Sequence, residues 1–205
     1  MSTNDRELIY GRIRSAIGAL PEPAPLPEFN DEQVIRRDTR TADDPWQRFA
    51  QRMQAIHGHT FVDATELAAW LREQGKIHGY CDPELWPILS PSFGDGFIIE
   101  TTFDRSRVDD YQFGLTRASG AIAETGTIIL KDKVASPRLA ALAPWVHIAA
   151  FKHAEIHPTL PDAIRALGDD PNIIWVTGPS KTGDIESVLV EGMHGPGVQV
   201  ALLLG

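Results

Sequence analysis

Two short hydrophobic runs near the C-terminus are separated by a turn-rich segment. Residues 173–177 (IIWVT) are apolar and rich in β-forming residues, and Gly178-Pro179-Ser180 ends the run abruptly. We expect a strand over residues 173–177 that lies at the centre of a parallel sheet and is buried on both faces. Residues 198–204 predict a second apolar strand.

The segment after Ser180 predicts a helix. Either Ser180 or Thr182 can cap its first turn. Asp184 and Glu186 fall where the positive end of the helix dipole favours carboxylates. The apolar residues that follow repeat at helical spacing (Ile185, Val188, Leu189). The expected turn from strand to helix then lies at the carboxyl end of a parallel strand, where α/β proteins bind ligands.

Strand-like and helix-like patterns alternate along the remainder of the chain. Further strands are predicted over residues 77–80, 97–103, 111–116, 127–130 and 146–151. Helices are predicted over residues 45–56, 63–74, 139–142 and 160–167, with a short small-residue helix over residues 117–124. This alternation predicts a three-layer α/β/α sandwich with a largely parallel sheet.

The first thirty residues have a different organisation. Residues 5–20 predict an exposed helix with one apolar face, and residues 21–29 carry four prolines at alternate positions, which favours an extended linker. We therefore divide the chain into an N-terminal helix with its linker, residues 1–29, and an α/β domain, residues 30–205. The tethered helix is expected to dock onto a partner or a second copy of the chain.

Charge and cysteine content exclude several classes of protein. The chain has 19 Lys+Arg against 28 Asp+Glu, a net charge of -9, which argues against nucleic-acid binding and against basic attachment to membranes. The single cysteine, Cys81, cannot form an internal disulfide and cannot alone hold zinc or an iron–sulfur cluster. No signal peptide or membrane-length apolar run is evident. We expect a soluble cytoplasmic protein without a metal site.

Two sets of side chains have acid–base or ligand chemistry. Glu124 precedes a Thr-Gly break, where a carboxylate held away from water acts as nucleophile or base, or simply ends a helix at the surface. His153, Glu155 and His157 alternate, so on a strand they would share one face. That set suits zinc or iron(II), but we favour the solvated end of a strand as its explanation.

The turn over residues 178–182 is a candidate anion site. It is not a P-loop, because Ser180 rather than glycine precedes Lys181-Thr182. Backbone N–H groups, two hydroxyls and the Lys181 ammonium can nonetheless hold an anion at a helix start. A well-capped turn without a ligand is the alternative. His194, in the later glycine-rich turn, can orient a substrate or cap carbonyl groups.

Three motifs together resemble a known family. AIAETGT at residues 121–127, TGPSKTGDIE at 177–186 and GMHGP at 192–196 occur in the order found in the lactate-utilization (LUD) domain family, in its lactate utilization protein C form. The resemblance covers about residues 77–205. Lys181, Gly183 and Met193 stand where arginine, alanine and valine are usual, so the charge at Lys181 is kept but a bidentate contact is not.

The resemblance implies a fold similar to the sugar-isomerase and CoA-transferase group. It also implies a role in oxidising L-lactate to pyruvate with two iron–sulfur partner proteins. No cofactor is expected in this chain, since the clusters would belong to those partners. Two alternatives stay open: a non-catalytic scaffold or ligand-binding subunit of that complex, and a free-standing acyl or CoA transferase. Whether the chain is itself catalytic also stays open.

The motifs define the predicted site. We expect Glu124, Ser180, Lys181, Thr182 and His194 to line one pocket for a small carboxylate substrate, with Lys181 facing the anion. Glu124 and His194 are the catalytic candidates. The other residues expected to bind substrate are Thr125, Gly126, Gly178, Pro179, Asp184 and Glu186.

Overall fold

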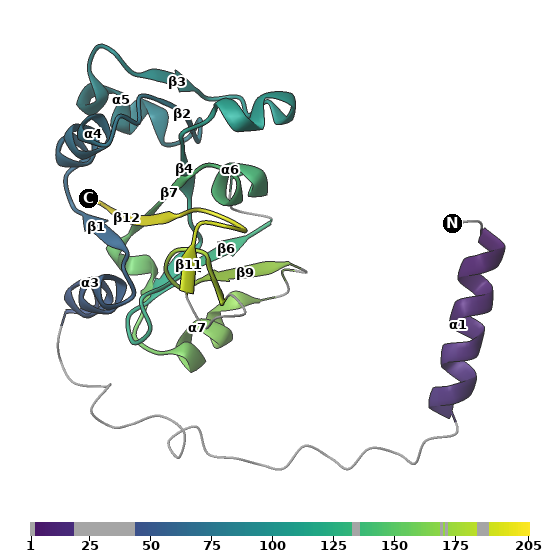
Figure 1. Ribbon diagram of the computed structural model, residues 1–205. Helices are drawn as coiled ribbons and strands as arrows, with labels where there is room; N and C mark the ends of the chain where they lie inside the picture. Colours follow the sequence, from purple (N-terminus) through teal and green to yellow (C-terminus); the bar gives the residue numbers. More distant parts are fainter. Residues whose placement is uncertain (1–2, 19–43, 133–135, 169, 171, 184–188) are drawn as a thin grey trace. The chain divides into compact units, whose positions relative to one another are not determined.

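The computed structural model describes residues 3–18, 44–132, 136–168, 170, 172–183 and 189–205 (Figure 1). The chain splits into two compact units, Met1–Val34 and Ile35–Gly205. In the first unit α1 (Thr3–Gly18) forms the predicted N-terminal helix, and its apolar side chains Ile9, Ile13 and Ile17 are exposed. The Pro-rich linker and the division after residue 29 lie outside the described residues, so that division stays a prediction.

A six-stranded parallel sheet forms the centre of the second unit (Figure 1). Its order is β1 (His59–Phe61), β12 (Val198–Leu204), β7 (Val146–Lys152), β4 (Phe113–Arg117), β2 (His78–Cys81) and β3 (Ile98–Glu100). Every neighbouring pair is parallel. The two longest strands, β7 and β12, are neighbours along seven residue pairs and are apolar because both of their faces are covered.

One face of this sheet is covered by α4 (Ala64–Glu73) and α5 (Trp86–Phe93). The helix α4 begins as its sequence predicts, since the Asp63 carboxylate accepts a hydrogen bond of 2.6 Å from the Thr65 N–H. Its inner face buries Leu67 and Leu71 against the strands. Gly75, with φ 67°, follows the helix in the expected left-handed conformation.

The opposite face is covered by α3 (Pro45–Ala55), α6 (Arg138–Leu142) and a second, four-stranded sheet. The second sheet has the order β8 (Ile156–His157), β5 (Gly120–Ile122), β6 (Thr127–Lys131) and β9 (Ile173–Val176). On its far side packs α7 (Leu160–Leu167), through Ala163. Helices thus lie on both sides of a largely parallel sheet, and the predicted three-layer α/β/α architecture is confirmed, with the small sheet as an addition.

Three short elements complete the described fold. These are the 3-10 helices η2 (Arg105–Asp110) and η3 (His153–Glu155), and the hairpin of β10 (Lys181–Gly183) with β11 (Leu189–Glu191). The hairpin corrects the helix predicted after Ser180, because Lys181 to Gly183 are paired antiparallel with Leu189 to Glu191. The capping and dipole positions assigned to Asp184 and Glu186 lie outside the described residues.

The strand over residues 173–177 was placed wrongly. It forms β9, which among the described strands pairs only with β6 and lies at the edge of the small sheet, and its Trp175 is 37% exposed. A short apolar run does not distinguish a strand buried on both faces from an edge strand that covers the core with one face. The centre of the parallel sheet belongs to β7, β12 and β4 instead.

The short helix predicted over residues 117–124 is also wrong. Residues 120–122 form β5, which pairs antiparallel with β6 and parallel with β8. Ala118, Ala121 and Ala123 are buried beneath α3, where small side chains let the elements approach closely. Tertiary pairing therefore overrides the helix propensity of these alanines.

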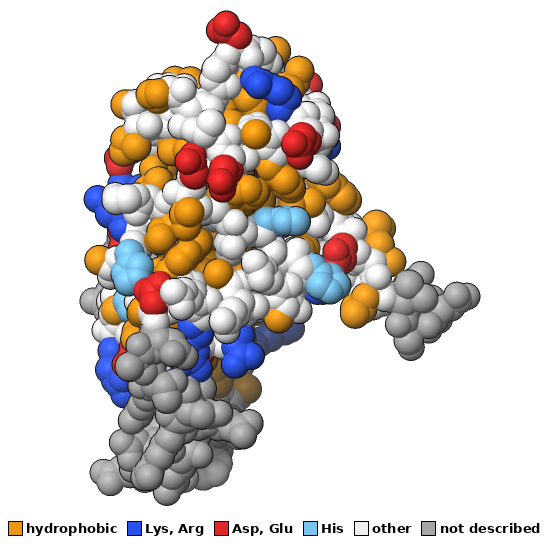
Figure 2. Space-filling model, turned by 90° about the vertical axis from the view of Figure 1, so that its left-hand side faces the viewer, with side chains coloured by type: hydrophobic (Ala, Val, Ile, Leu, Met, Phe, Trp, Pro, Cys, Tyr) orange, Lys and Arg blue, Asp and Glu red, His pale blue; other side chains and the backbone are white. Residues whose placement is uncertain are grey.

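Exposed hydrophobic side chains on the outer surface are dispersed. Figure 2 views the molecule from the side on which Figure 1 labels α3, β1 and α4, and hydrophobic patches there alternate with charged and polar side chains. Among the described helices, none combines the length and the hydropathy needed to cross a bilayer.

Candidate functional site

Two of the three sequence motifs meet through a row of threonines. The Thr127 hydroxyl lies 2.8 Å from that of Thr177 and 2.7 Å from that of Thr125. The turn before β6 and the turn after β9 are together because these strands are antiparallel neighbours, with Ile128 opposite Val176. The predicted convergence of the two turns is present, but it does not arise from parallel strands.

Both turns press against the C-terminal part of α3, and each does so at a glycine. Gly126 has φ 68°, and a Cβ there would lie 2.7 Å from the Met53 backbone nitrogen. Gly178 has φ 80°, and a Cβ there would lie 2.9 Å from the Ile56 carbonyl oxygen. Only glycine fits at either position, which explains two of the motif residues in structural terms.

The Lys181 ammonium is already paired. Its Nζ lies 3.3 Å from a carboxylate oxygen of Glu191 and 3.5 Å from the Ile56 carbonyl oxygen, just beyond α3. His57 Nδ1 contacts the same Glu191 oxygen at 3.0 Å, and the His57 and Lys181 hydrogen bonds lower the pKa of Glu191. Lys181 lies in β10, so the helix start predicted at this position is wrong. The ammonium that was expected to face an anion contacts the Glu191 carboxylate instead.

A hollow of about 380 Å³, which we call the motif cavity, lies beside β9. It is lined by Ala141, Leu142, Ile174, Trp175, Val176, Thr177, Gly178, Pro179, Ser180, His194, Gly195, Pro196 and Gln199. The second and third motifs are joined at its wall, since the Ser180 N–H donates to the Pro196 carbonyl and the Gly192 N–H donates to the Ser180 carbonyl, both at 2.9 Å.

The motif cavity has neutral polar groups among apolar walls. Within the described part of the chain, the Ser180 hydroxyl has no hydrogen-bond partner and no lysine or arginine lines the cavity. His194 stands in the wall, and Gln199 lines the cavity from β12. The arrangement suits a small ligand that is recognised by hydrogen bonds rather than by a fixed cation.

The other predicted site residues lie elsewhere. A Glu124 oxygen accepts a hydrogen bond of 2.9 Å from the Leu160 N–H, so this carboxylate caps the start of α7 and does not line the motif cavity. Thr182 pairs with Val190 in the hairpin. Of the five side chains expected in one pocket, the structure brings Ser180 and His194 together.

A buried polar row behind the motif cavity was missed by sequence reasoning. His147 is fully buried; its Nε2 lies 2.9 Å from the Thr116 hydroxyl and its Nδ1 lies 3.0 Å from Gln199 Oε1. Burial lowers the pKa of His147 to about 4, so the imidazole is neutral. The available signal was one polar residue at the second position of two apolar strands, VHIAAFK and VQVALLL.

The alternating set near residue 155 does not form a metal site. His153 and Glu155 lie in η3 and His157 lies in β8, so the three side chains do not share one strand face. His153 Nε2 instead bonds to the Asp44 carboxylate at 2.6 Å and lowers the pKa of that group. Across the described ranges, no group of three or more His, Cys, Asp or Glu side chains is placed to hold a metal ion.

A family model identifies the chain. The LUD domain model matches residues 94–204, which is more than half of the chain. The chain belongs to the LUD domain family. The resemblance drawn from the three motifs is thereby confirmed.

Named relatives extend this result. Lactate utilization protein C of Bacillus subtilis is 31% identical, with 98% of this chain and 95% of that protein covered. Lactate utilization protein C of Deinococcus radiodurans is 35% identical over a segment that covers 47% of this chain and 48% of the relative, so that match spans about half of each protein. The crystal structure of a DUF162 family protein from Deinococcus radiodurans is similar in fold to this LUD protein, with a TM-score of 0.57, 22% identity, and coverage of 78% and 96%.

Proposed function

We propose that this LUD protein is a subunit of a complex that oxidises L-lactate to pyruvate together with iron–sulfur partner proteins. The observation that carries the proposal is the alignment with the Bacillus subtilis lactate utilization protein C along nearly the whole chain. The motif cavity supports a ligand-binding part, because two family motifs form its wall and supply the Ser180 hydroxyl and the His194 imidazole.

The chemistry divides between this chain and its partners. Conversion of L-lactate to pyruvate releases two electrons and two protons, and the electrons need an acceptor. Burial raises the pKa of the single cysteine, Cys81, to about 12, so its thiol is neutral and inert. We therefore assign the acceptor clusters to the partners. In the motif cavity the Ser180 hydroxyl would bind the substrate carboxylate and His194 would take the hydroxyl proton. The Cα hydrogen would leave as the second proton, and both electrons would pass to the clusters of the partners.

The remaining alternatives are less well supported. An acyl transferase that uses Glu124 as nucleophile requires a free carboxylate at a ligand site, whereas Glu124 accepts the Leu160 N–H and does not line the motif cavity. A scaffold role agrees with the exposed Trp145 and Met193 near the third motif and with the exposed apolar side of α1. The L-lactate-dependent activity of variants in the motif cavity distinguishes a scaffold from a substrate-binding subunit.

Substitutions in the motif cavity test the ligand-binding part. Ser180→Ala is expected to lower the L-lactate-dependent reduction of an electron acceptor by the assembled complex about tenfold, because it removes one hydrogen bond to the substrate. His194→Gln is expected to lower it at least about a hundredfold, because it removes the base. Lys181→Met and Glu124→Gln serve as matched controls, since both side chains are engaged outside the cavity. Unchanged activity in the first pair, with the complex intact, would indicate a scaffold. Normal growth on L-lactate after deletion of the gene would reject the proposed function altogether.

Removal of residues 1–29 tests assembly. The helix α1 exposes Leu8, Ile9, Ile13 and Ile17, and we expect its deletion to weaken co-purification with the iron–sulfur partners while the thermal unfolding of the α/β unit is retained. The control is Arg14→Ala, which leaves these apolar side chains in place. Equal recovery of partners with the truncated and full chains would contradict the prediction.

A further inference from the structure

The strand order creates a switch point between β2 and β4. After β2 the chain passes through α5 to β3 on one side, whereas after β4 it proceeds to β7 and then to β12 on the other side. The helix α5 packs on one face of the sheet and α6 on the opposite face. Open α/β sheets bind ligands beyond the carboxyl ends of their strands at such a point. The motif cavity, beside the small sheet, does not occupy this position.

A hollow does occupy it, and we call it the switch-point crevice. Its larger part, about 550 Å³, is lined by Tyr80, Asp82, Pro83, Glu84, Thr101, Thr102, Phe103, Arg117, Ser136 and Pro137. Its smaller part, about 260 Å³, is lined by Glu84, Leu85, Ile88, Arg117, Ala150, Phe151, Lys152, Glu155 and Leu204. Glu84 and Arg117 line both parts, so their ion pair lies between the two.

Two cations stand at the ends of neighbouring strands in this crevice. Arg117 ends β4 and Lys152 ends β7, and both line the smaller part. Arg117 pairs with Glu84, whose side chain is 70% exposed, and solvent weakens such a surface pair. No ion pair joins Lys152 to any residue that the structure describes. A ligand anion with bidentate geometry can therefore displace Glu84.

Buried hydrogen bonds fix the backbone around these cations. Asp82 is 8% exposed; one carboxylate oxygen accepts the Ser136 hydroxyl and the other accepts the Glu84 N–H at 2.9 Å. The Arg117 N–H donates to the Ser136 hydroxyl oxygen at 3.0 Å. Both Asp82 oxygens are thus engaged within the protein. This carboxylate positions the ends of β2 and β4 and leaves Arg117 and Lys152 to face a ligand.

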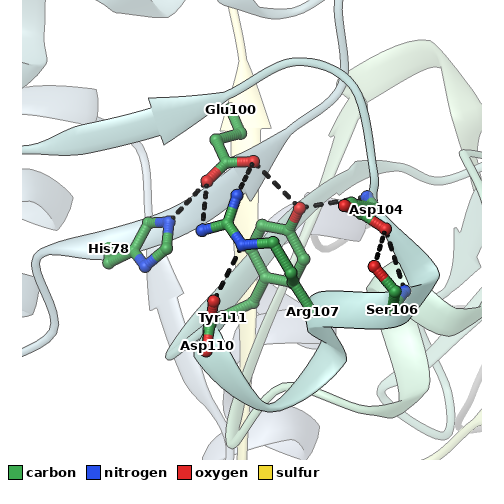
Figure 3. A network of polar contacts seen from close by, with 7 residues as sticks. All are labelled: His78, Glu100, Asp104, Ser106, Arg107, Asp110 and Tyr111. Carbon is green, nitrogen blue, oxygen red and sulfur yellow. Dashed lines mark hydrogen bonds and ion pairs between the residues drawn. The ribbon is translucent and has the colours of Figure 1, made fainter.

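A network centred on Glu100 orders the loop that forms the opposite wall (Figure 3). The Glu100 carboxylate accepts hydrogen bonds from His78 Nε2 at 2.8 Å and from the Tyr111 hydroxyl at 3.0 Å, and it pairs with Arg107 at 3.2 Å. These contacts lower the pKa of Glu100, the His78 hydrogen bond most of all. The Asp104 N–H donates to the Tyr111 oxygen at 3.0 Å, which fixes the loop after β3.

That wall presents hydroxyl groups and an aromatic ring. Thr101 and Thr102 line the larger part, and neither hydroxyl is bonded to a residue in the described ranges. Phe103 and Tyr80 lie beside them with ring centroids 5.6 Å apart. The crevice thus has two cations at one end, beside the carboxylates of Glu84 and Glu155, and the threonine hydroxyl groups at the other.

We propose that the switch-point crevice binds an organic anion that carries hydroxyl groups. The charged group, a carboxylate or a phosphate ester, lies between Arg117 and Lys152 in place of Glu84. The hydroxyl groups of the ligand bond to Thr101 and Thr102. This site is separate from the motif cavity and does not depend on the proposed role in L-lactate oxidation.

Calorimetric titration of the full chain tests this site with three related probes. Glycerate and glycerol 3-phosphate carry the two kinds of charged group on similar hydroxylated carbons, and glycerol is the neutral control. At least one anion is expected to bind, and glycerol is not. Arg117→Gln and Lys152→Gln should each weaken binding about tenfold, because each removes one charge-assisted hydrogen bond. Glu84→Gln should strengthen binding, since it removes the competing carboxylate.

A further variant separates this site from indirect effects. Arg138→Gln breaks a surface ion pair with Asp132 outside the crevice and should leave binding unchanged. Absence of binding by both anions at about 10 mM would overturn the proposal. So would binding that resists both cation substitutions, or binding weakened by Glu84→Gln. Thermal unfolding confirms that each variant is folded.

Discussion

Replacement of Gly114 by alanine is expected to lower the free energy of unfolding by about 3 kcal/mol, the upper range for overpacking of a core. Gly114 lies in β4, and a Cβ at this position would be 1.8 Å from the Ala140 carbonyl oxygen in α6. The Ala140 carbonyl carbon would lie 2.9 Å from the same Cβ, and both atoms belong to the backbone, so no flexible side chain can move aside. Either α6 or the centre of the parallel sheet has to shift.

Urea unfolding followed by circular dichroism measures this effect. Gly183→Ala is the matched control, because nothing lies within 4 Å of a Cβ at that glycine and its φ is not positive. Gly114→Ala should shift the unfolding midpoint strongly, and Gly183→Ala should shift it little. Equal midpoints for the two variants would show that α6 is not packed directly on β4.

The Gly114 contact also matters for the motif cavity. Ala141 and Leu142, which follow Ala140 in α6, line that cavity together with Ser180 and His194. A displaced α6 would therefore alter the cavity wall as well as the core. The packing of α6 on β4 at Gly114 therefore helps to position the wall of the motif cavity. The sequence around Gly114 does not indicate this contact.

The sequence predicted a helix or strand correctly where residues close in the chain determine it. Asp44 and Asp63 both accept hydrogen bonds from the backbone two residues on, as their positions before a helix indicate. The apolar runs at β7 and β12 are strands for the same kind of reason. The errors over residues 117–124 and 173–177 arose because the pairing of these segments with other strands was not predicted. Which strand pairs with which, and whether a face is covered, depends on residues distant in the chain.

In the candidate site, too, some features could be predicted from the sequence and others depend on residues that are distant in the chain. The convergence of the turns at Gly126 and Gly178 was predicted, and their tight approach to α3 explains these glycines. The environment of Lys181 could not be predicted, because its partner Glu191 joins it only through an unforeseen hairpin. The switch-point crevice likewise requires the order of the strands, which brings Arg117 and Lys152 together from positions 35 residues apart.

Below neutral pH, a large effect on stability should come from His147. Its imidazole is fully buried and neutral with a pKa of about 4, whereas an unfolded histidine has the model value of 6.5. The unfolded chain therefore binds a proton as the pH falls below 6.5, while the folded chain does not. The stabilisation is complete above pH 6.5, declines between pH 6.5 and 4, and the loss totals about 3 kcal/mol over that window.

Unfolding free energies of the wild type and His147→Gln, measured from pH 7 to pH 4, check this contribution. The difference between the two proteins should shift by about 3 kcal/mol in favour of the variant as the pH falls, because glutamine has no proton to bind. His153→Gln is the control, since that ring is 54% exposed and lies at the surface beside Asp44. A pH-independent difference would mean that His147 can accept a proton in the folded state. The motif cavity would then have a titrating group one hydrogen bond behind Gln199, and lactate-dependent activity would follow its pKa.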